Sequence, residues 1–555
     1  MTMRNPRLPV RRGGLPRRDP RYASGARGSG GPRLDARSGL LLAGLFVLLV
    51  GAPLYVLGAF GGRGTPPLAG SPTPAGSLGP SAAPSSPPAS PAAPAVGRMP
   101  IVPVVRFWST KRSASQAELA TALSGEDARW KSIVVPTGMR DTIGRLLGVA
   151  PGPGVLEGDP KAIRQAVKTG GLGFMRAADV TPAVRALAVD RVELFGNDRV
   201  EALDAWPLVV ETTHGAGYDP GRAFTIMAAG DILLDRGVAR QVTVLGKGVD
   251  FPFDGGTAEI TGFTCCSGFG RRVPVTKRTG NEGAVRRLLS EADLALANLE
   301  NATPKRWRYH TSGLVFTGDP RLLDGVRKAG FDYLSLANNH SGNGGRQGLI
   351  ETIRAVRERG FATSGAGRRL AEARAPAILE THGLRIAVLA CDGIAPAYWA
   401  RDDRIGVAPC DSDNLVPDIK AADAQADIVL VYPHWGREYQ ARPTGGQRAQ
   451  ARAWLRAGAD VILGNHAHWT AGIEEIGDGL AFYALGNFVF DQAWSEQTMQ
   501  GMLAELTFDG PTLRQVRLHP TLILDQAQPN LMDPAGDGKV VIQRVRDGSK
   551  GILDW

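Results

Sequence analysis

Cysteine is scarce in this chain of 555 residues, and the few cysteines lack the spacing of a metal or redox site. They are Cys265, Cys266, Cys391 and Cys410, and no two of them form a C-x-x-C pair. This argues against a thiolate zinc site and against thioredoxin-type chemistry. In an oxidising compartment a disulfide is allowed, and Cys391 with Cys410 would close a short loop. Adjacent Cys265 and Cys266 are awkward partners for one another, and the sequence leaves the connectivity open.

Beyond residue 38 the chain has almost no excess of positive charge. The chain has 64 Lys and Arg against 54 Asp and Glu, a formal net charge of +10. Residues 1–38 contain ten Arg and two Asp and hold +8 of it, which leaves +2 for the rest of the chain. Because that remainder has no basic stripe interleaved with aromatics, the sequence argues against nucleic acid as a partner.

Charge is absent from residues 39–62, which are rich in Leu, Val, Ala and Gly. About 22 helical residues at roughly 1.5 Å each match a hydrocarbon core of about 30 Å. We therefore predict a basic cytoplasmic tail at 1–38 and a single transmembrane helix at 39–62, with the main domains outside the cell membrane. A cleaved signal peptide is the main alternative, and a buried core helix is a weaker one. Residues 63–98, rich in Pro, Ser and Ala, predict a disordered linker.

Residues 99–213 alternate short apolar runs with helical patterns, which predicts a small α/β domain with a mainly parallel sheet. Its stretch Phe107-Trp108-Ser109, with Gly125, Trp130 and the Gly-Leu-Gly-Phe-Met run ending at Met175, resembles one lobe of a periplasmic phosphate-type substrate-binding protein. We expect a structural or ligand-docking role for this domain. The expected strands are 101–107, 132–136 and 173–176, and the expected helices are 115–123 and 160–168.

From Phe224 onward, polar residues repeatedly follow apolar strands, with helical patterns between them at 283–291, 319–329, 346–359 and 447–457. In open α/β sheets ligands bind beyond the carboxyl ends of strands, so these polar residues should converge on one crevice. Imidazole, carboxylate and amide oxygen together suit divalent Zn, Mn or Fe and argue against an all-oxygen calcium site. The strand-end residues are Asp231, Glu300, Asn339, His340, His434, His466 and His468.

Six motifs in fixed order resemble the capsule-synthesis CapA family, which is linked to poly-γ-glutamate capsule formation and related to metallophosphoesterases. They are Gly230-Asp231, Asn298-Leu299-Glu300, Asn338-Asn339-His340, His434-Trp435-Gly436-Arg437-Glu438, Gly464-Asn465-His466-Ala467-His468 and Leu485-Gly486-Asn487-Phe488. The resemblance implies a metallophosphoesterase-like domain at 224–525, an α/β fold built as a four-layer α/β/β/α sandwich with a two-metal crevice between the sheets. The membrane span, the linker and the small α/β domain would precede it.

The resemblance also implies roles for individual residues. Asp231 and His468 correspond to ligands of a first metal, Asn339, His434 and His466 to ligands of a second, and Glu300 to the carboxylate that bridges them. His340 corresponds to an uncoordinated imidazole that stabilises developing charge or protonates a leaving group. Further candidates for contact with ligands or substrate are Asn338, Glu438 as a partner of His434, Asn487, Arg308 and His310.

The chain departs from the phosphoesterase pattern at three positions. Leu233 stands where that pattern has a histidine ligand, Glu300 where it more often has Asp, and Ser341 where many members have an acid. Loss of one histidine would weaken the first metal site or leave a mononuclear centre. The CapA-like family itself commonly shows the first two departures, which therefore identify a branch of the superfamily.

These expectations combine into a membrane-anchored, extracytoplasmic protein of capsule or envelope polymer biosynthesis. We expect a metal-dependent hydrolase or transferase that uses a metal-bound water and two divalent ions, Mn, Fe or Zn. The alternative is a non-catalytic component that binds the polymer for export or anchoring. The expected partners are an anionic capsule or envelope polymer and capsule synthase or export proteins.

Overall fold

A computed structural model describes residues 97–212 and 218–555 of the chain. The predicted tail at 1–38, the predicted span at 39–62 and almost all of the predicted linker at 63–98 lie outside the described residues. Within the described part of the chain, no helix combines the length and the apolar character needed to cross a membrane. The first strand, β1, begins at Gly97, slightly before the expected end of the linker.

The amino-terminal part of the described chain is a small α/β domain with a mixed sheet, ordered β4-β3-β5-β1-β6, in which β8 also pairs with β1. The expectation of a mainly parallel sheet is wrong. β3 is parallel to β4 and β5, but β1 is antiparallel to β5, β6 and β8, because β1 enters the sheet at its centre in the opposite direction. The elements are β1 (Gly97–Arg106), β2 (Ser113–Ala114), α1 (Gln116–Ser124), β3 (Ile133–Pro136), α2 (Arg140–Leu147), β4 (Val155–Gly158), α3 (Pro160–Lys168), β5 (Leu172–Arg176), β6 (Val184–Ala186), β7 (Ala188–Val189) and β8 (Val209–Thr212).

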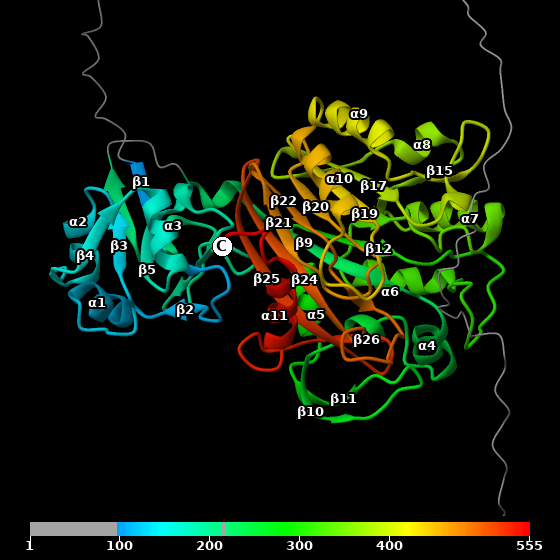
Figure 1. Cartoon of the computed structure of the whole chain (residues 1–555), viewed down its shortest axis with the longest axis horizontal. Coiled ribbons are helices and arrows are strands. Elements are labelled where there is room, and N and C mark those ends of the chain that lie inside the picture. The colour runs from blue at the N-terminus through cyan, green and yellow to red at the C-terminus, as the bar shows by residue number, and fades with distance from the viewer. Residues whose placement is uncertain (1–96, 213–217) are drawn as a thin grey trace, which may run out of the picture. The chain divides into compact units, whose positions relative to one another are not determined.

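The first sheet of the larger domain has the order β11-β10-β26-β25-β24-β9-β12-β13-β14, and β23 also pairs with β9 (Figure 1). β9, β12, β13 and β14 are parallel, whereas β24 is antiparallel to β9 and to β25. The strands are β9 (Ala223–Ile232), β10 (Thr257–Thr264), β11 (Val273–Gly280), β12 (Leu294–Leu299), β13 (Tyr333–Ser335), β14 (Ala362–Ser364), β23 (Asn487–Val489), β24 (Gln500–Asp509), β25 (Thr512–Leu524) and β26 (Gln528–Leu531).

The second sheet has the order β16-β17-β19-β20-β22-β21, and its central strands are parallel. Its strands are β16 (Ala377–Thr381), β17 (Leu384–Asp392), β19 (Ile428–His434), β20 (Val461–Leu463), β21 (Ile473–Ile476) and β22 (Gly479–Phe482), and β15 (Ala366–Gly367) pairs separately with β18 (Gly406–Val407). The helices of the larger domain are α4 (Arg236–Ala239), α5 (Ala284–Ser290), α6 (Leu323–Lys328), α7 (Gly345–Glu358), α8 (Leu370–Arg374), α9 (Ser412–Asp423), α10 (Gly445–Arg456) and α11 (Lys539–Gly548).

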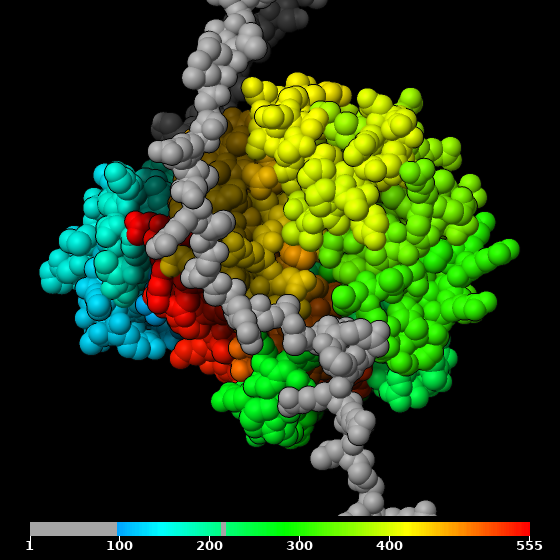
Figure 2. Space-filling view, turned by 45° about the vertical axis from the view of Figure 1, so that its right-hand side comes forward, coloured from blue at the N-terminus to red at the C-terminus, as the bar shows by residue number. Residues whose placement is uncertain are grey.

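The side chains of the second sheet alternate between two cores, as the period of a β-strand requires. Ile386 and Val388 of β17 share a core with Ile226 of β9 in the first sheet. Ala387 and Leu389 point the opposite way, into the core formed with α9 and α10. The two sheets therefore face each other across a common core, and α9 and α10 pack on the other face of the second sheet (Figure 1). Figure 2 shows the yellow part of the chain, which includes α9, at the molecular surface. The expectation of a mixed α/β domain is confirmed.

The helices predicted at 283–291, 319–329, 346–359 and 447–457 correspond to α5, α6 with the short turn before it, α7 and α10. The larger domain continues beyond the predicted boundary at 525. β26 adds a strand to the first sheet and α11 packs against β24 and β25. Cys391 and Cys410 form a disulfide, and Cys265 is paired with Cys266 between β10 and β11.

Candidate metal centre

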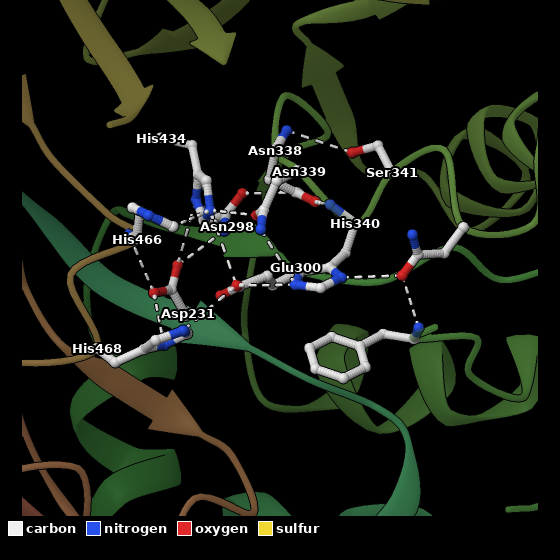
Figure 3. A network of polar contacts seen from close by, with 12 residues as sticks. Asp231, Asn298, Glu300, Asn338, Asn339, His340, Ser341, His434, His466 and His468 are labelled. Carbon is white, nitrogen blue, oxygen red and sulfur yellow. Dashed lines mark hydrogen bonds and ion pairs between the residues drawn. The ribbon is translucent and has the colours of Figure 1, made fainter. Parts of the chain in front are cut away.

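The carboxyl ends of strands from both sheets meet at one place and bring the predicted site residues together (Figure 3). Asp231 lies near the end of β9, and Glu300 follows β12. Asn339 and His340 follow β13, and His434 ends β19. His466 and His468 come after β20, where both adopt positive φ angles of 87° and 54°. This strained turn aims both imidazoles at the carboxylates, as local strain at functional sites often does.

Asp231 is fully buried and held by two hydrogen bonds. Its Oδ1 accepts from Asn298 Nδ2 at 2.8 Å, and its Oδ2 accepts from the backbone N–H of His466 at 3.2 Å. A shift in the register between β9 and β12 places Asp231 opposite Asn298, which re-aims the carboxylate toward the crevice. Burial raises the pKa of Asp231 to about 6, although both hydrogen bonds oppose the rise.

Glu300 is the most isolated charge of the site. It is fully buried, and neither carboxylate oxygen has a hydrogen-bond partner among the described residues. Burial, and then the charge of Asp231, raise its pKa well above the usual range. Its Oε1 lies 3.7 Å from His434 Nε2, 3.9 Å from His468 Nε2 and 4.0 Å from His340 Nε2. A buried carboxylate without donors is costly unless a cation neutralises it.

One group of donors surrounds His434. His434 Nε2 lies 3.1 Å from His466 Nδ1 and 2.8 Å from Asn339 Oδ1. Two ligands about 2.1 Å from one ion, at roughly right angles, are about 3 Å apart, so this spacing fits a common ion. Burial, and then the neighbouring imidazoles, lower the pKa of His434 well below its ordinary value and that of His466 to about 3. Both rings are therefore neutral near pH 7 and can offer lone pairs to a metal.

A second group consists of Asp231, Glu300 and His468, whose ligand atoms lie within 4.8 Å of one another. Asn487 fixes the ring of His468. Asn487 Nδ2 donates to Gln492 Oε1 and to the Thr498 carbonyl, so its Oδ1 accepts the hydrogen bond from His468 Nδ1 at 2.9 Å. The lone pair of His468 is then on Nε2, the atom nearer to Glu300 Oε1.

Glu300 belongs to both groups, because the possible ligand atoms of Glu300, His434 and His466 also lie within 4.8 Å of one another. The orphaned Glu300 oxygens, the neutral imidazoles and the ligand spacing all fit divalent metal ions. The predicted ligands Asp231, Glu300, Asn339, His434, His466 and His468 thus lie together, and Glu300 lies between the two groups, where the resemblance puts the bridging carboxylate.

His340 stands beside the two groups. Its Nδ1 donates to Asn343 Oδ1 at 2.9 Å, its Nε2 accepts from Asn339 Nδ2 at 3.2 Å, and its ring stacks on Phe316 at 3.9 Å between centroids. Burial lowers the pKa of His340 to about 4. The neutral ring therefore has its lone pair on Nε2, which accepts from Asn339 and lies 4.0 Å from Glu300 Oε1.

The position of the missing histidine is filled by an apolar cluster. Leu233 is fully buried and packs with Phe316, Phe490 and Ile523. Phe316 stacks on His340, and the Phe490 ring lies 5.1 Å from that of His468. At position 233 the chain therefore has no metal ligand. Leu233 instead packs with the two phenylalanines that contact the rings of His340 and His468.

The remaining candidates are less central. Asn338 links the end of β12 to His340, because its Nδ2 donates to the Leu299 carbonyl at 2.7 Å and its Oδ1 accepts from the His340 N–H at 3.1 Å. Arg308 is exposed, and His310 lies 3.2 Å from the buried Asp235, away from the two donor groups.

The expectation that Glu438 supports His434 is wrong. Glu438 is exposed, and in the described chain the residue next to His434 Nδ1 is Asn298, whose Nδ2 lies 3.3 Å away. Asn298 was part of a quoted motif but was given no role, although it lies two residues before Glu300 and so points to the same side of the chain. Asn343 was also missed, since its contact with His340 depends on a turn that has no clear sequence signal.

Together the two facing sheets and the donors at their strand ends define a mixed α/β protein with a candidate metal centre. Residues 225–492 match the family model described as bacterial capsule synthesis protein PGA_cap. The capsule biosynthesis protein CapA of Bacillus anthracis is 31% identical over 300 residues, which cover 51% of this chain and 72% of that protein. The chain belongs to this bacterial capsule synthesis protein family.

The chain is also similar to a second capsule protein and to several solved structures. The PGA biosynthesis protein CapA of Bacillus subtilis strain 168 is 32% identical over 231 residues, covering 40% of this chain and 61% of that protein. Among solved structures, a hypothetical protein from Thermus thermophilus has 14% identity and a TM-score of 0.31, covering 53% of this chain and 98% of its own. A 5'-nucleotidase precursor from the same organism has 13% identity and a TM-score of 0.33, covering 59% and 58%.

Proposed function

We propose that this protein is a metal-dependent hydrolase or transferase of capsule polymer biosynthesis and that its polymer is poly-γ-glutamate. The observation that carries the proposal is Glu300, a buried carboxylate without a hydrogen-bond partner in the described chain, flanked by neutral imidazoles on both sides. The choice of polymer is supported by relatives named for capsule and PGA biosynthesis.

When bound, divalent ions would supply Lewis acidity and lower the pKa of nearby water. Asp231, Glu300 and His468 would hold one ion, and Asn339, His434 and His466 the other. His340 would take up a proton at Nε2 and return it to the leaving group, because Asn343 keeps the other nitrogen protonated. Phe316 would hold the His340 ring in place and exclude water from its face.

We also propose that the protein acts outside the cell, anchored through the predicted helix at 39–62 with its amino terminus in the cytoplasm. The charge-free apolar segment and the Arg-rich tail before it support this topology. Its partners would be the anionic polymer and capsule synthase or export proteins.

A second candidate is a non-catalytic polymer-binding component for export or anchoring. It is favoured by Leu233, which puts an apolar side chain where the phosphoesterase pattern has a histidine ligand. His340 distinguishes the two candidates, because it is a proton carrier in the first and has no chemical role in the second.

The test combines metal analysis with one variant. The purified full-length chain is assayed for bound Mn, Fe and Zn and for metal-stimulated cleavage of poly-γ-glutamate. We expect His340→Ala to keep the metal, to lower kcat by about 10²–10⁴-fold and to abolish polymer production in cells. If the wild-type chain binds no metal and cleaves neither poly-γ-glutamate nor a phosphodiester, the enzymatic proposal is wrong. Polymer production that survives His340→Ala would favour the binding component.

A further inference from the structure

A cavity of about 260 Å³ lies beside the metal centre, and the proposed chemistry does not use it. It opens at α4, the short helix that follows β9 and hence Asp231. The lining residues that matter here are Arg236, Arg240, Tyr309, Thr311, Asp491 and Trp494.

The charges of this cavity leave one guanidinium unused. Asp491 accepts hydrogen bonds from Arg236 Nε at 3.0 Å and Nη2 at 2.5 Å, and also from the backbone N–H of Gly237 at 3.0 Å. The Asp491 carboxylate is therefore neutralised by Arg236. The Arg240 side chain is exposed and has no hydrogen-bond or ion-pair partner among the described residues. The cavity thus carries a net positive charge.

Neutral donors add to this charge. Tyr309, Thr311 and Trp494 also line the cavity, and their side chains have no hydrogen-bond partner in the described ranges. The one carboxylate of the lining, Asp491, is already paired with Arg236. Donors around a cavity with net positive charge favour a ligand rich in acceptor oxygens. A carboxylate meets this requirement and matches the planar fork of a guanidinium.

Two aromatic rings connect the cavity to the metal centre. The Arg236 guanidinium lies 4.3 Å from the centroid of Phe316, whose ring is stacked on His340. On another side, Trp494 is 6.2 Å from Tyr439, and Tyr439 is 6.0 Å from His468, between ring centroids. The cavity is therefore separated from two imidazoles of the site by about one aromatic ring each.

We propose that this cavity is a subsite for a carboxylate of the anionic polymer, next along the chain from the unit at the metal centre, with Arg240 as its main ligand. The inference rests on the proposed function, because it takes its ligand from the proposed polymer. Such a subsite would hold the polymer in register and select for repeating carboxylates.

The experiment measures binding of γ-linked glutamate oligomers of increasing length to the purified full-length chain by calorimetry. We expect affinity to rise with length in the wild-type chain and Arg240→Gln to weaken binding of the longer oligomers by about tenfold or more. Arg240→Lys keeps the positive charge but loses the planar guanidinium that can bind a carboxylate through two N–H groups. Its affinity for the longer oligomers should lie between those of the wild type and Arg240→Gln. Arg354→Gln, at an exposed position on α7, is the matched control and should change binding by less than about twofold.

The outcomes separate the subsite from the proposed function. If the wild-type chain binds the oligomers and Arg240→Gln binds them no worse than Arg354→Gln, the subsite is wrong and the proposed function stands. If the wild-type chain binds no oligomer of any length, the proposed polymer is wrong and the carboxylate subsite falls with it. If Arg240 is needed for a phosphodiester polymer and the glutamate oligomers do not bind, the carboxylate assignment is overturned.

Discussion

Glu300 determines the electrostatic character of the metal centre. Its two oxygens are buried without donors in the described chain, and Asp231 adds a second buried carboxylate nearby. Without a cation these groups repel each other, which is why burial and the charge of Asp231 raise the pKa of Glu300. The same side chain that destabilises the metal-free protein should therefore contribute most to metal binding.

We predict that Glu300→Gln changes stability in opposite directions with and without metal. Near pH 8 the metal-free variant should be more stable than the wild type by about 1 kcal/mol or more, since a buried unpaired charge is removed. Added Mn²⁺ or Zn²⁺ should raise the thermal midpoint of the wild type and leave that of the variant almost unchanged. Thermal unfolding after chelation and after titration with each metal measures both effects.

Glu358→Gln is the matched control, because Glu358 is exposed on α7 and belongs to neither donor group. It should behave as the wild type in both conditions. A Glu300→Gln chain that is still stabilised by metal to the wild-type extent would show that Glu300 is not a shared ligand.

At the scale of elements, the turn after β20 positions two of the imidazoles. Gly464 opens this turn, and a Cβ at this position would lie 2.2 Å from the Tyr483 carbonyl oxygen and 2.6 Å from Trp435 Nε1. Any side chain here must push the turn away from β22. His466 and His468 follow immediately in a strained backbone, so the displacement would reach both donor groups.

We predict that Gly464→Ala weakens metal binding at least about tenfold and lowers the thermal midpoint, although it removes no ligand. Gly445→Ala is the control, because a Cβ at Gly445 meets nothing within 4 Å at the start of α10. Metal titration of both variants, followed by calorimetry, measures the difference. Equal affinities in the two variants would mean that the turn adapts and does not position the ligands.

The same elements show what the sequence can predict. α3 was expected at 160–168 and runs over those residues, because Asp159 caps it and Pro160 occupies its first turn. α2 was missed since its start has no side-chain cap, and β4 was missed since half of its residues are exposed at the sheet edge. Strand-end residues such as Asp231 and His434 were predictable because a parallel sheet gathers them at one edge. The contact between Asn298 and His434 depends on how the two sheets face each other, which local patterns do not encode.

At the scale of the whole molecule, an ionic network around the buried Glu505 joins the small domain to the larger one. Arg517 of β25 pairs with Glu193 of the small domain, and its Nη1 lies 3.7 Å from Glu505 Oε1. His519 Nε2 lies 2.7 Å from Glu505 Oε2. Burial alone would raise the pKa of Glu505, but the hydrogen bond with His519 and the charge of Arg517 outweigh it and lower the pKa to about 2.

This lowered pKa predicts how stability depends on pH. The carboxylate has a pKa near 4.5 in the unfolded chain and about 2 in the folded chain, so it stabilises the fold above pH 4.5. That contribution, roughly 3 kcal/mol, is lost as the pH falls from about 4.5 towards 2. Glu505→Gln should therefore lower the urea midpoint at pH 7 and make it less sensitive to acid. Glu358→Gln, at an exposed position on α7, should follow the wild type. If Glu505→Gln loses stability between pH 6 and pH 3 as steeply as the wild type, the lowered pKa of Glu505 is not a source of the acid sensitivity of the fold.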